Sequence, residues 1–465
     1  MSDAARYKID WMPDGLDVGT PRYLAIAAAI GKDIEGGRLL PGDRLPPQRR
    51  LAHHLGMDFT TVARAYVEAQ NRGLVQSTVG RGTFVTKPAV KSVPDKLSAA
   101  VDFSMNLPPE PDNAALIARM EAGLAEVGRD IVSLLRYQSF GGSHEAKQAA
   151  RNWLARRGIE PASERLFITA GAHAALVSIL GILAKPGEVV LTEAVTYPGA
   201  RSIAAQLGIR LVGLTMDEQG IDPDALRMAC ETVRPRALYV NPTLQNPTSL
   251  TMPAPRRLAI AEVARRFGVP IIEDDAYGFI APQPPAAFAV LAPDLTWHIA
   301  GLSKCLGAGL RCAYVVTPDA RAAWPFVASS RATTVMASPL TEALATRWIE
   351  DGTGDAIIHF IRSEAMARQA IARDILAGFE FQSGLGGFSL WLKLPVPWTR
   401  SAFVGQMQSR GIGIVPSDAF TVAGAPPEAV RICLGGPTKR SEMQAALAFM
   451  AHALADSPAL TSGYL

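Results

Sequence analysis

The spacing of apolar positions in residues 1–86 predicts three helical segments followed by a strand-like segment. The segment 22–40, RYLAIAAAIGKDIEGGRLL, predicts an amphipathic helix. A turn-rich stretch leads to a short helical segment over 47–56 and a longer one over 59–73. Residues 74–86 predict two short strands around a Gly-Arg-Gly turn. Three helices followed by a hairpin is the order of a winged helix-turn-helix domain.

The ends of these helices carry residues that start or stop a helix. Gly36 and Gly37 end the first helix. Gly56 closes the second, because glycine makes a tight turn without strain. Asp58 is the expected N-cap of the third helix, since its carboxylate accepts a hydrogen bond from an unpaired backbone N–H.

Beyond a Pro-containing linker over 87–101, short apolar runs alternate with helical stretches such as 253–268. Alternating strands and helices predict an α/β domain with a mostly parallel sheet covered on both faces. Near 385–394 the pattern changes to a smaller α+β region that continues to the end of the domain over 102–465. The apolar runs expected to be strands are 188–193, 209–214, 237–241 and 269–274.

Composition narrows the class of protein. Of 465 residues, 48% are hydrophobic and 19% charged, which suits a folded core and carries no signature of disorder. The net charge of +3 is nearly neutral, so any affinity for DNA must come from a local surface. The four cysteines are scattered, and no apolar run has transmembrane length, so we expect a cytoplasmic protein that does not enter a membrane.

Four spaced motifs lie within 38–85, namely PG-x-RLP, R-x-LA-x-x-LG, TV-x-x-AY and G-x-GTFV. Together they resemble the winged helix of GntR-type regulators, which implies binding to a double-stranded DNA operator as a homodimer. Five side chains fall on outward or leading faces or at the wing tip, within reach of phosphates or base edges. These candidate DNA-binding residues are Arg49, Thr60, Thr61, Arg64 and Arg81.

A solvated helical surface would explain any single arginine of this set equally well, but not the set together. One position departs from the family. Phe59 stands at the start of the recognition helix, where these regulators usually have a polar or basic residue. This difference argues against direct base reading at that position.

The rest of the chain carries a second ordered set of motifs. They are 136-RYQSFGG-142, 168-ITAGAHAAL-176, 196-TYPG-199, 239-YVNPTLQNPTS-249, 271-IIEDDAYGF-279, 301-GLSKCLGAGLR-311 and 430-VRICLGG-436. As a set they make residues 102–450 resemble the fold type I aminotransferases, which depend on pyridoxal 5′-phosphate. The fusion to a winged helix resembles the MocR subfamily of GntR regulators.

The resemblance assigns roles around the cofactor. Lys304 forms the Schiff base, and a desolvated cationic site favours the neutral amine that this bond requires. Arg311 pairs with the phosphate, which suits a planar guanidinium, and Ser303 adds a hydroxyl. Asp274 keeps the pyridine nitrogen protonated, and Tyr277 hydrogen-bonds the 3′-oxygen.

Asparagine and backbone groups complete the implied cofactor site. Asn246 donates to the 3′-oxygen, although Asn241 also precedes a turn and the pattern alone does not separate the two. The backbone N–H groups of Gly171, Ala172 and His173 hold the phosphate at a helix N-terminus. We expect no metal site, because His173 has no second ligand at a matching spacing.

The resemblance assigns roles to three further residues, and two positions differ from the family pattern. Tyr197 stacks on the pyridine ring, Tyr137 reaches the phosphate from the partner subunit, and Arg431 binds a substrate carboxylate. Ser249 stands where the loop usually has Gly. Gly301 stands where Ser or Thr usually contacts the phosphate, a loss of at most about 1.5–3 kcal/mol in cofactor binding.

Three functions follow from the two resemblances. The first is a regulator that senses pyridoxal phosphate or a small amino-compound effector forming an aldimine with it. The second is a working aminotransferase with a vestigial N-terminal module. The third is a DNA-binding protein whose second domain only dimerises. The intact wing motif favours the first over the second, and the complete lysine, aspartate, tyrosine and arginine set argues against the third. Slow transamination stays open, since the same lysine serves both roles.

Overall fold

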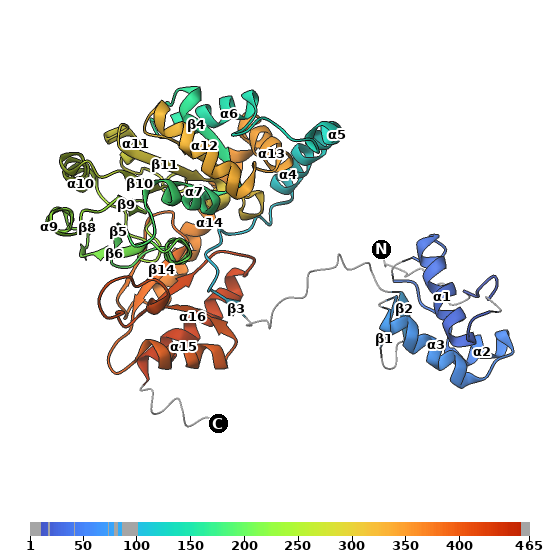
Figure 1. Ribbon diagram of the computed structural model, residues 1–465. Coiled ribbons are helices and arrows are strands. Elements are labelled where there is room, and N and C mark those ends of the chain that lie inside the picture. Colours follow the sequence, from blue (N-terminus) through green and yellow to red (C-terminus); the bar gives the residue numbers. More distant parts are fainter. Residues whose placement is uncertain are drawn as a thin grey trace. The chain divides into compact units, whose positions relative to one another are not determined.

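A computed structural model of the chain separates into two compact units, Met1–Leu97 and Ser98–Leu465 (Figure 1). The residues that the structure describes are 11–16, 19–40, 42–72, 74–78, 82–85 and 101–456.

The first unit has the order of elements predicted from the sequence. Gly56 ends the second helix in the left-handed conformation with φ 59°, and the Asp58 side chain caps the third by accepting from Thr60 N at 3.1 Å. The two strands pair antiparallel. The elements are α1 (Arg22–Glu35), α2 (Gln48–Leu55), α3 (Phe59–Asn71), β1 (Val75–Thr78) and β2 (Gly82–Val85).

The three helices enclose a small apolar core. Ile26 and Ile30 of α1 pack with Leu51 of α2 and Val62 of α3, and all four are fully buried. Tyr66 is buried with them, and its hydroxyl donates to Pro46 O at 2.7 Å, which satisfies the one polar group of that side chain. The outer faces of α2 and α3 are thereby left to solvent.

The second unit is built on a mostly parallel sheet, as the alternating pattern predicts. The strand order is β4-β12-β11-β10-β9-β5-β6, and β12 alone among these runs antiparallel to both its neighbours. The strands are β4 (Leu166–Thr169), β5 (Val189–Glu193), β6 (Arg210–Leu214), β9 (Ala237–Val240), β10 (Ile271–Asp274), β11 (Thr296–Gly301) and β12 (Ala313–Val316).

Helices cover both faces of this sheet (Figure 1). One face packs on α7 (Ala172–Leu183), α8 (Pro198–Gln206) and α12 (Ala320–Thr334). The other packs on α9 (Pro223–Val233), α10 (Ala254–Phe267) and α11 (Phe288–Leu291). A third cluster joins the sheet to α4 (Ala114–Val127), α6 (His144–Ala155), α13 (Pro339–Glu350) and α14 (Thr353–Ile375). The short α5 (Ile131–Leu134) follows α4, and a hairpin of β7 (Met216–Asp217) and β8 (Gly220–Ile221) follows β6.

A smaller α+β domain lies beside the large sheet, orange to red in Figure 1, as the change of pattern near 385 predicts. Its antiparallel sheet has the order β13-β14-β17-β16. The strands are β13 (Phe381–Gln382), β14 (Ser389–Lys393), β16 (Val415–Pro416) and β17 (Ala429–Cys433), and the helices are α15 (Arg400–Ser409) and α16 (Arg440–Ala455). Within it, β3 (Val101–Asp102) pairs parallel with β15 (Ile412–Gly413), so the start of this unit is held on its small domain.

Across the part of the chain that the structure describes, every helix is too short or too polar to cross a membrane.

Candidate functional site

A cavity of about 420 Å³ opens where the carboxyl ends of β10 and β11 face the small domain. Most of the site residues predicted from the sequence line it together. They are Ala172, His173, Tyr197, Asn246, Asp274, Tyr277, Ser303, Lys304, Arg311 and Arg431. The polar ends of distant segments meet here because parallel strands end at one edge of a sheet.

Asp274 ends β10 and is buried at the floor of the cavity. Tyr239 donates to its Oδ2 at 2.8 Å, while Oδ1 has no hydrogen-bond partner within the described residues. Burial raises the pKa of Asp274 to about 6. A buried acceptor without a donor suits a ligand that brings its own N–H, such as a protonated ring nitrogen.

Two asparagines that the sequence left unseparated have different partners. Asn241 Nδ2 donates to the backbone carbonyl of Asp274 at 2.5 Å, and its Oδ1 accepts from the backbone N–H of Asn246 at 2.9 Å. Asn246 instead turns its Oδ1 to Arg431 Nη1 at 2.9 Å, which leaves its Nδ2 as a donor. Both asparagines line the cavity, and they differ in that Asn241 is bonded to the backbone while the Asn246 amide oxygen is bonded to Arg431.

Lys304 lies in a 3-10 turn, Leu302–Lys304, directly after β11. Its Nζ donates to the backbone carbonyl of Asn106. Burial lowers the pKa of Lys304 to about 8, because the cavity disfavours the charged ammonium. Nearly a tenth of such amines are neutral one pH unit lower, so the group is a competent nucleophile near neutrality.

An anion cradle lies at the N-terminus of α7. Gly171 is its N-cap with φ +92°, and a Cβ there would stand 3.2 Å from Arg311 Nη2. The helix N-terminus and the Arg311 guanidinium thus lie next to each other and can bind the same anion. Burial and the charge of Arg311 both lower the pKa of His173. The donor set fits a phosphate group.

Arg431 comes from β17 of the small domain and is 6% exposed. Besides Asn246, its Nη2 donates to the backbone carbonyl of Ser104, and its guanidinium lies 5.0 Å from the centroid of the Phe420 ring. Its Nε has no partner within the described part of the chain. A buried guanidinium with an unused N–H suits a carboxylate.

The two departures from the family have different structural consequences. Ser249 adopts the left-handed conformation at φ 60°, and its Oγ lies 2.9 Å from Ser389 Oγ, so the backbone takes a glycine-like conformation without glycine. Gly301 lines the cavity, and a Cβ there would meet Ala172 Cβ at an ordinary 3.4 Å. The Cβ of a serine at 301 would therefore fit without displacing Ala172.

Several residues of the site were not found by sequence reasoning. Ser104 and Asn106 line the cavity and contact Arg431 and Lys304 through backbone carbonyls, which leave no signature in a sequence. Tyr239 offered a weak signal, because a tyrosine in a wholly buried strand needs a partner for its hydroxyl.

Tyr137 lies outside this cavity and is 85% exposed on its own chain. A contact with a partner subunit's cofactor is not contradicted by this position, and it stays a prediction.

In the first unit, Arg49, Thr60 and Arg64 are exposed, and Thr61 is partly so. The guanidinium of Arg49 lies 5.9 Å from the centroid of the Phe59 ring, which is itself 45% exposed. Phe59, at the start of α3, therefore lies beside an arginine from the start of α2. Arg64 lies over the ring of Tyr23 at 4.5 Å. Arg81 lies outside the described residues.

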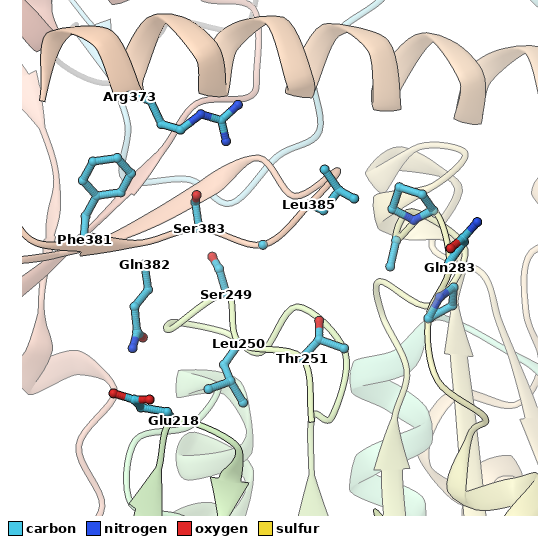
Figure 2. A pocket seen from close by; sticks show the side chains of 14 residues that line it. Glu218, Ser249, Leu250, Thr251, Gln283, Arg373, Phe381, Gln382, Ser383 and Leu385 are labelled. Carbon is cyan, nitrogen blue, oxygen red and sulfur yellow. The ribbon is translucent and has the colours of Figure 1, made fainter. Parts of the chain in front are cut away.

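A larger hollow of about 920 Å³ lies elsewhere, between the loop of Ser249 and the segment of β13 and the residues after it (Figure 2). Figure 2 shows Arg373 pointing down from α14 and Glu218 next to Gln382. None of the strongly shifted titratable groups named above lines it. We place the candidate site in the smaller cavity, where such groups converge.

Comparisons with known proteins agree with both units. The family described as aminotransferase class I and II matches residues 99–449, and the gntR family of bacterial regulatory proteins matches residues 22–85. The chain is 29% identical over 455 residues to YdeF of Bacillus subtilis, an uncharacterized HTH-type transcriptional regulator, covering 97% of this chain and 98% of that one. It is 28% identical over 444 residues to the HTH-type transcriptional regulator TauR of Rhodobacter capsulatus, covering 84% and 88%.

Among solved structures, the fold is similar to that of LysN, the α-aminoadipate aminotransferase of Thermus thermophilus, complexed with N-(5′-phosphopyridoxyl)-L-leucine. The TM-score is 0.70 at 22% identity, over 84% of this chain and 98% of that one. An archaeal alanine:glyoxylate aminotransferase gives a TM-score of 0.71 at 22% identity, over 76% and 90%. These likenesses concern the fold.

Proposed function

Because the chain belongs to the aminotransferase class I and II family over residues 99–449, with a GntR domain over residues 22–85, we propose that it is a pyridoxal-phosphate-dependent transcription regulator. This is the MocR-like architecture, a GntR domain followed by an aminotransferase domain. In the proposal, the protein binds operator DNA and its occupancy of DNA changes with pyridoxal phosphate or with an amino compound held beside it.

One observation carries the proposal. A single cavity brings together a partly buried lysine of lowered pKa, a buried carboxylate with an unused oxygen and a helix N-terminus beside an arginine. These three are Lys304, Asp274 and the Gly171–Arg311 pair. When bound, pyridoxal phosphate supplies an aldehyde that captures amines and a ring that accepts electrons.

Different residues of the chain would bind different groups of the cofactor. Lys304 would offer the amine for attachment, and Asp274 Oδ1 would accept a hydrogen bond from the protonated ring nitrogen and so keep it protonated. Tyr277 and Asn246 would bind the ring oxygen, while Arg311 and the first N–H groups of α7 would bind the phosphate. Arg431 is left for the carboxylate of an amino acid. An effector needs only to bias the protein by about 1–3 kcal/mol to alter its occupancy of a promoter.

The test uses the full chain and DNA fragments that the protein itself selects from random sequence. DNA affinity and footprint are measured without cofactor, with pyridoxal phosphate and with a panel of natural L-amino acids. Turnover is measured in parallel with 2-oxoglutarate as acceptor. We expect ligand-dependent DNA binding and turnover far below the roughly 1–1000 per second of enzymes. Ordinary transaminase rates, with DNA binding indifferent to every ligand, would favour a working aminotransferase instead.

A further inference from the structure

The segment Ser104–Leu107 runs along the cavity and is held there by the residues that the proposed function gives to ligands. Lys304 Nζ donates to the carbonyl of Asn106, and Arg431 Nη2 donates to the carbonyl of Ser104. The side chain of Asn106 donates from Nδ2 to the phenol oxygen of Tyr277 at 2.7 Å.

Attachment of the cofactor and the contact with Asn106 compete for the same atom. When the neutral Lys304 amine attacks an aldehyde, a carbon–nitrogen double bond forms, and both amine hydrogens leave with the carbonyl oxygen as water. The hydrogen that Nζ donates to Asn106 O is then gone. The backbone of Asn106 therefore loses its partner in the step that loads the cofactor.

A ligand carboxylate competes with Ser104 for position on the Arg431 guanidinium. A guanidinium can pair with a carboxylate at two points, either through Nε and Nη2 or through Nη1 and Nη2. Both arrangements use Nη2, the atom that holds the Ser104 carbonyl. Arg431 Nη1 is already engaged with Asn246, and Nε is the N–H without a partner in the described chain. An incoming carboxylate must therefore share or take Nη2.

The residues just before this segment are firmly held. Phe103 is fully buried, its N–H donates to Gly413 O at 2.8 Å, and its carbonyl accepts from Cys433 N at 3.0 Å. Before it, Val101–Asp102 forms the two-residue strand β3 on β15. Residues 86–100 connect this strand to the GntR domain along the chain. A change at Ser104 and Asn106 thus begins a few residues from that connection.

We propose that Ser104–Asn106 is the ligand-responsive segment of this protein. The cofactor takes Lys304 from Asn106, an amino acid carboxylate takes Arg431 from Ser104, and the segment, which keeps the bond from the Asn106 side chain to Tyr277, changes its position next to β3. This inference rests on the proposed function and specifies the part of the chain that responds first.

The experiment places a nitroxide spin label on Met105→Cys in the full-length protein. Met105 is 59% exposed between the two carbonyls, and all four native cysteines are buried, so labelling is selective. The matched control is Met228→Cys on α9. Met228 is similarly exposed, at 58%, and does not line the cavity. The probes are pyridoxal phosphate and then propionate, a carboxylate without an amine.

We expect pyridoxal phosphate to convert the immobile component of the label at 105 into a mobile one, with the label at 228 unchanged. Propionate should add a saturable second change that Arg431→Lys abolishes, because lysine retains the charge without the two-point geometry. In Lys304→Ala the label at 105 should be mobile from the start, and the unchanged spectrum at 228 reports that the domain is folded.

The failures are distinguishable. A yellow absorbance band with an immobile label at 105 would overturn the inference and leave the proposed function standing. Equal changes at 105 and 228 would also overturn it, since the response would not be local. If pyridoxal phosphate gives no band at all, the proposed function falls and this inference falls with it.

Discussion

Tyr239 donates a 2.8 Å hydrogen bond to Oδ2 of Asp274, while Oδ1 of the same carboxylate is buried without a partner in the described chain. Only one of the two carboxylate oxygens therefore has a hydrogen-bond partner within the described chain. Burial raises its pKa to about 6, and the Tyr239 hydroxyl works against that rise. A group in this state destabilises the protein alone and binds strongly to a ligand that brings a donor.

The first prediction concerns Asp274→Asn. The folded pKa lies above the unfolded one, so this group contributes stability below about pH 4 that is lost as pH rises through about 6. Without cofactor, the variant should therefore be more stable than the parent at pH 8, by on the order of 1–3 kcal/mol. Its thermal midpoint should rise at pH 8, while its affinity for pyridoxal phosphate should fall. At pH 5 the difference in midpoint should shrink, and a lower midpoint at pH 8 would contradict the argument.

The second prediction concerns Lys304. Because burial lowers its pKa to about 8, the visible band should form at a rate that rises about tenfold per pH unit below 8 and levels off above it. Stopped-flow absorbance after mixing with pyridoxal phosphate measures this rate. Nα-acetyl-lysine is the control, since its rate should keep rising towards pH 10. Lys304→Ala should show no reducible band, and such a band in that variant would refute the attachment at 304.

The third prediction concerns the phosphate cradle. Gly301→Ser should strengthen cofactor binding by up to about 1.5–3 kcal/mol, because its Cβ fits and its hydroxyl adds a donor. Gly171→Ala is the opposite case. Its Cβ would crowd Arg311 at a left-handed position, so affinity should fall. Equilibrium dialysis measures the affinity of each variant for pyridoxal phosphate. Affinities equal to that of the parent in both variants would contradict a phosphate site at this position.

The fourth prediction concerns DNA. Arg49→Ala should weaken binding across sequences and reduce the salt slope by about one, because an exposed arginine on a leading edge neutralises a phosphate. Arg72→Ala is the matched control, since that arginine lies past the end of α3 and pairs with Glu68 at 2.8 Å. Lys304→Ala should leave the salt slope unchanged, because it removes no phosphate contact. Fluorescence anisotropy over a range of salt concentrations measures all three, and an equal loss for Arg72→Ala would contradict the assignment.

Local sequence determined the elements and much of the candidate site. Gly56 and Asp58 end and begin helices through their own backbone preference and hydrogen-bonding side chain, so neighbours alone predict them. Lys304 and Arg311 stand in one short motif after a strand, and Asp274 ends another. The period of the apolar positions likewise predicted the winged helix and the mostly parallel sheet.

Tertiary structure decided the contacts that join these motifs. Asn106 lies 171 residues from Tyr277 and 198 from Lys304, and it meets them only because β3 is held on the small domain beside the ends of the large strands. Its bond to Lys304 uses a backbone carbonyl, which every residue type possesses, so no letter in the sequence marks it. Periodicity and capping report on neighbours a few residues apart, whereas the order of strands sets which distant backbone atoms meet.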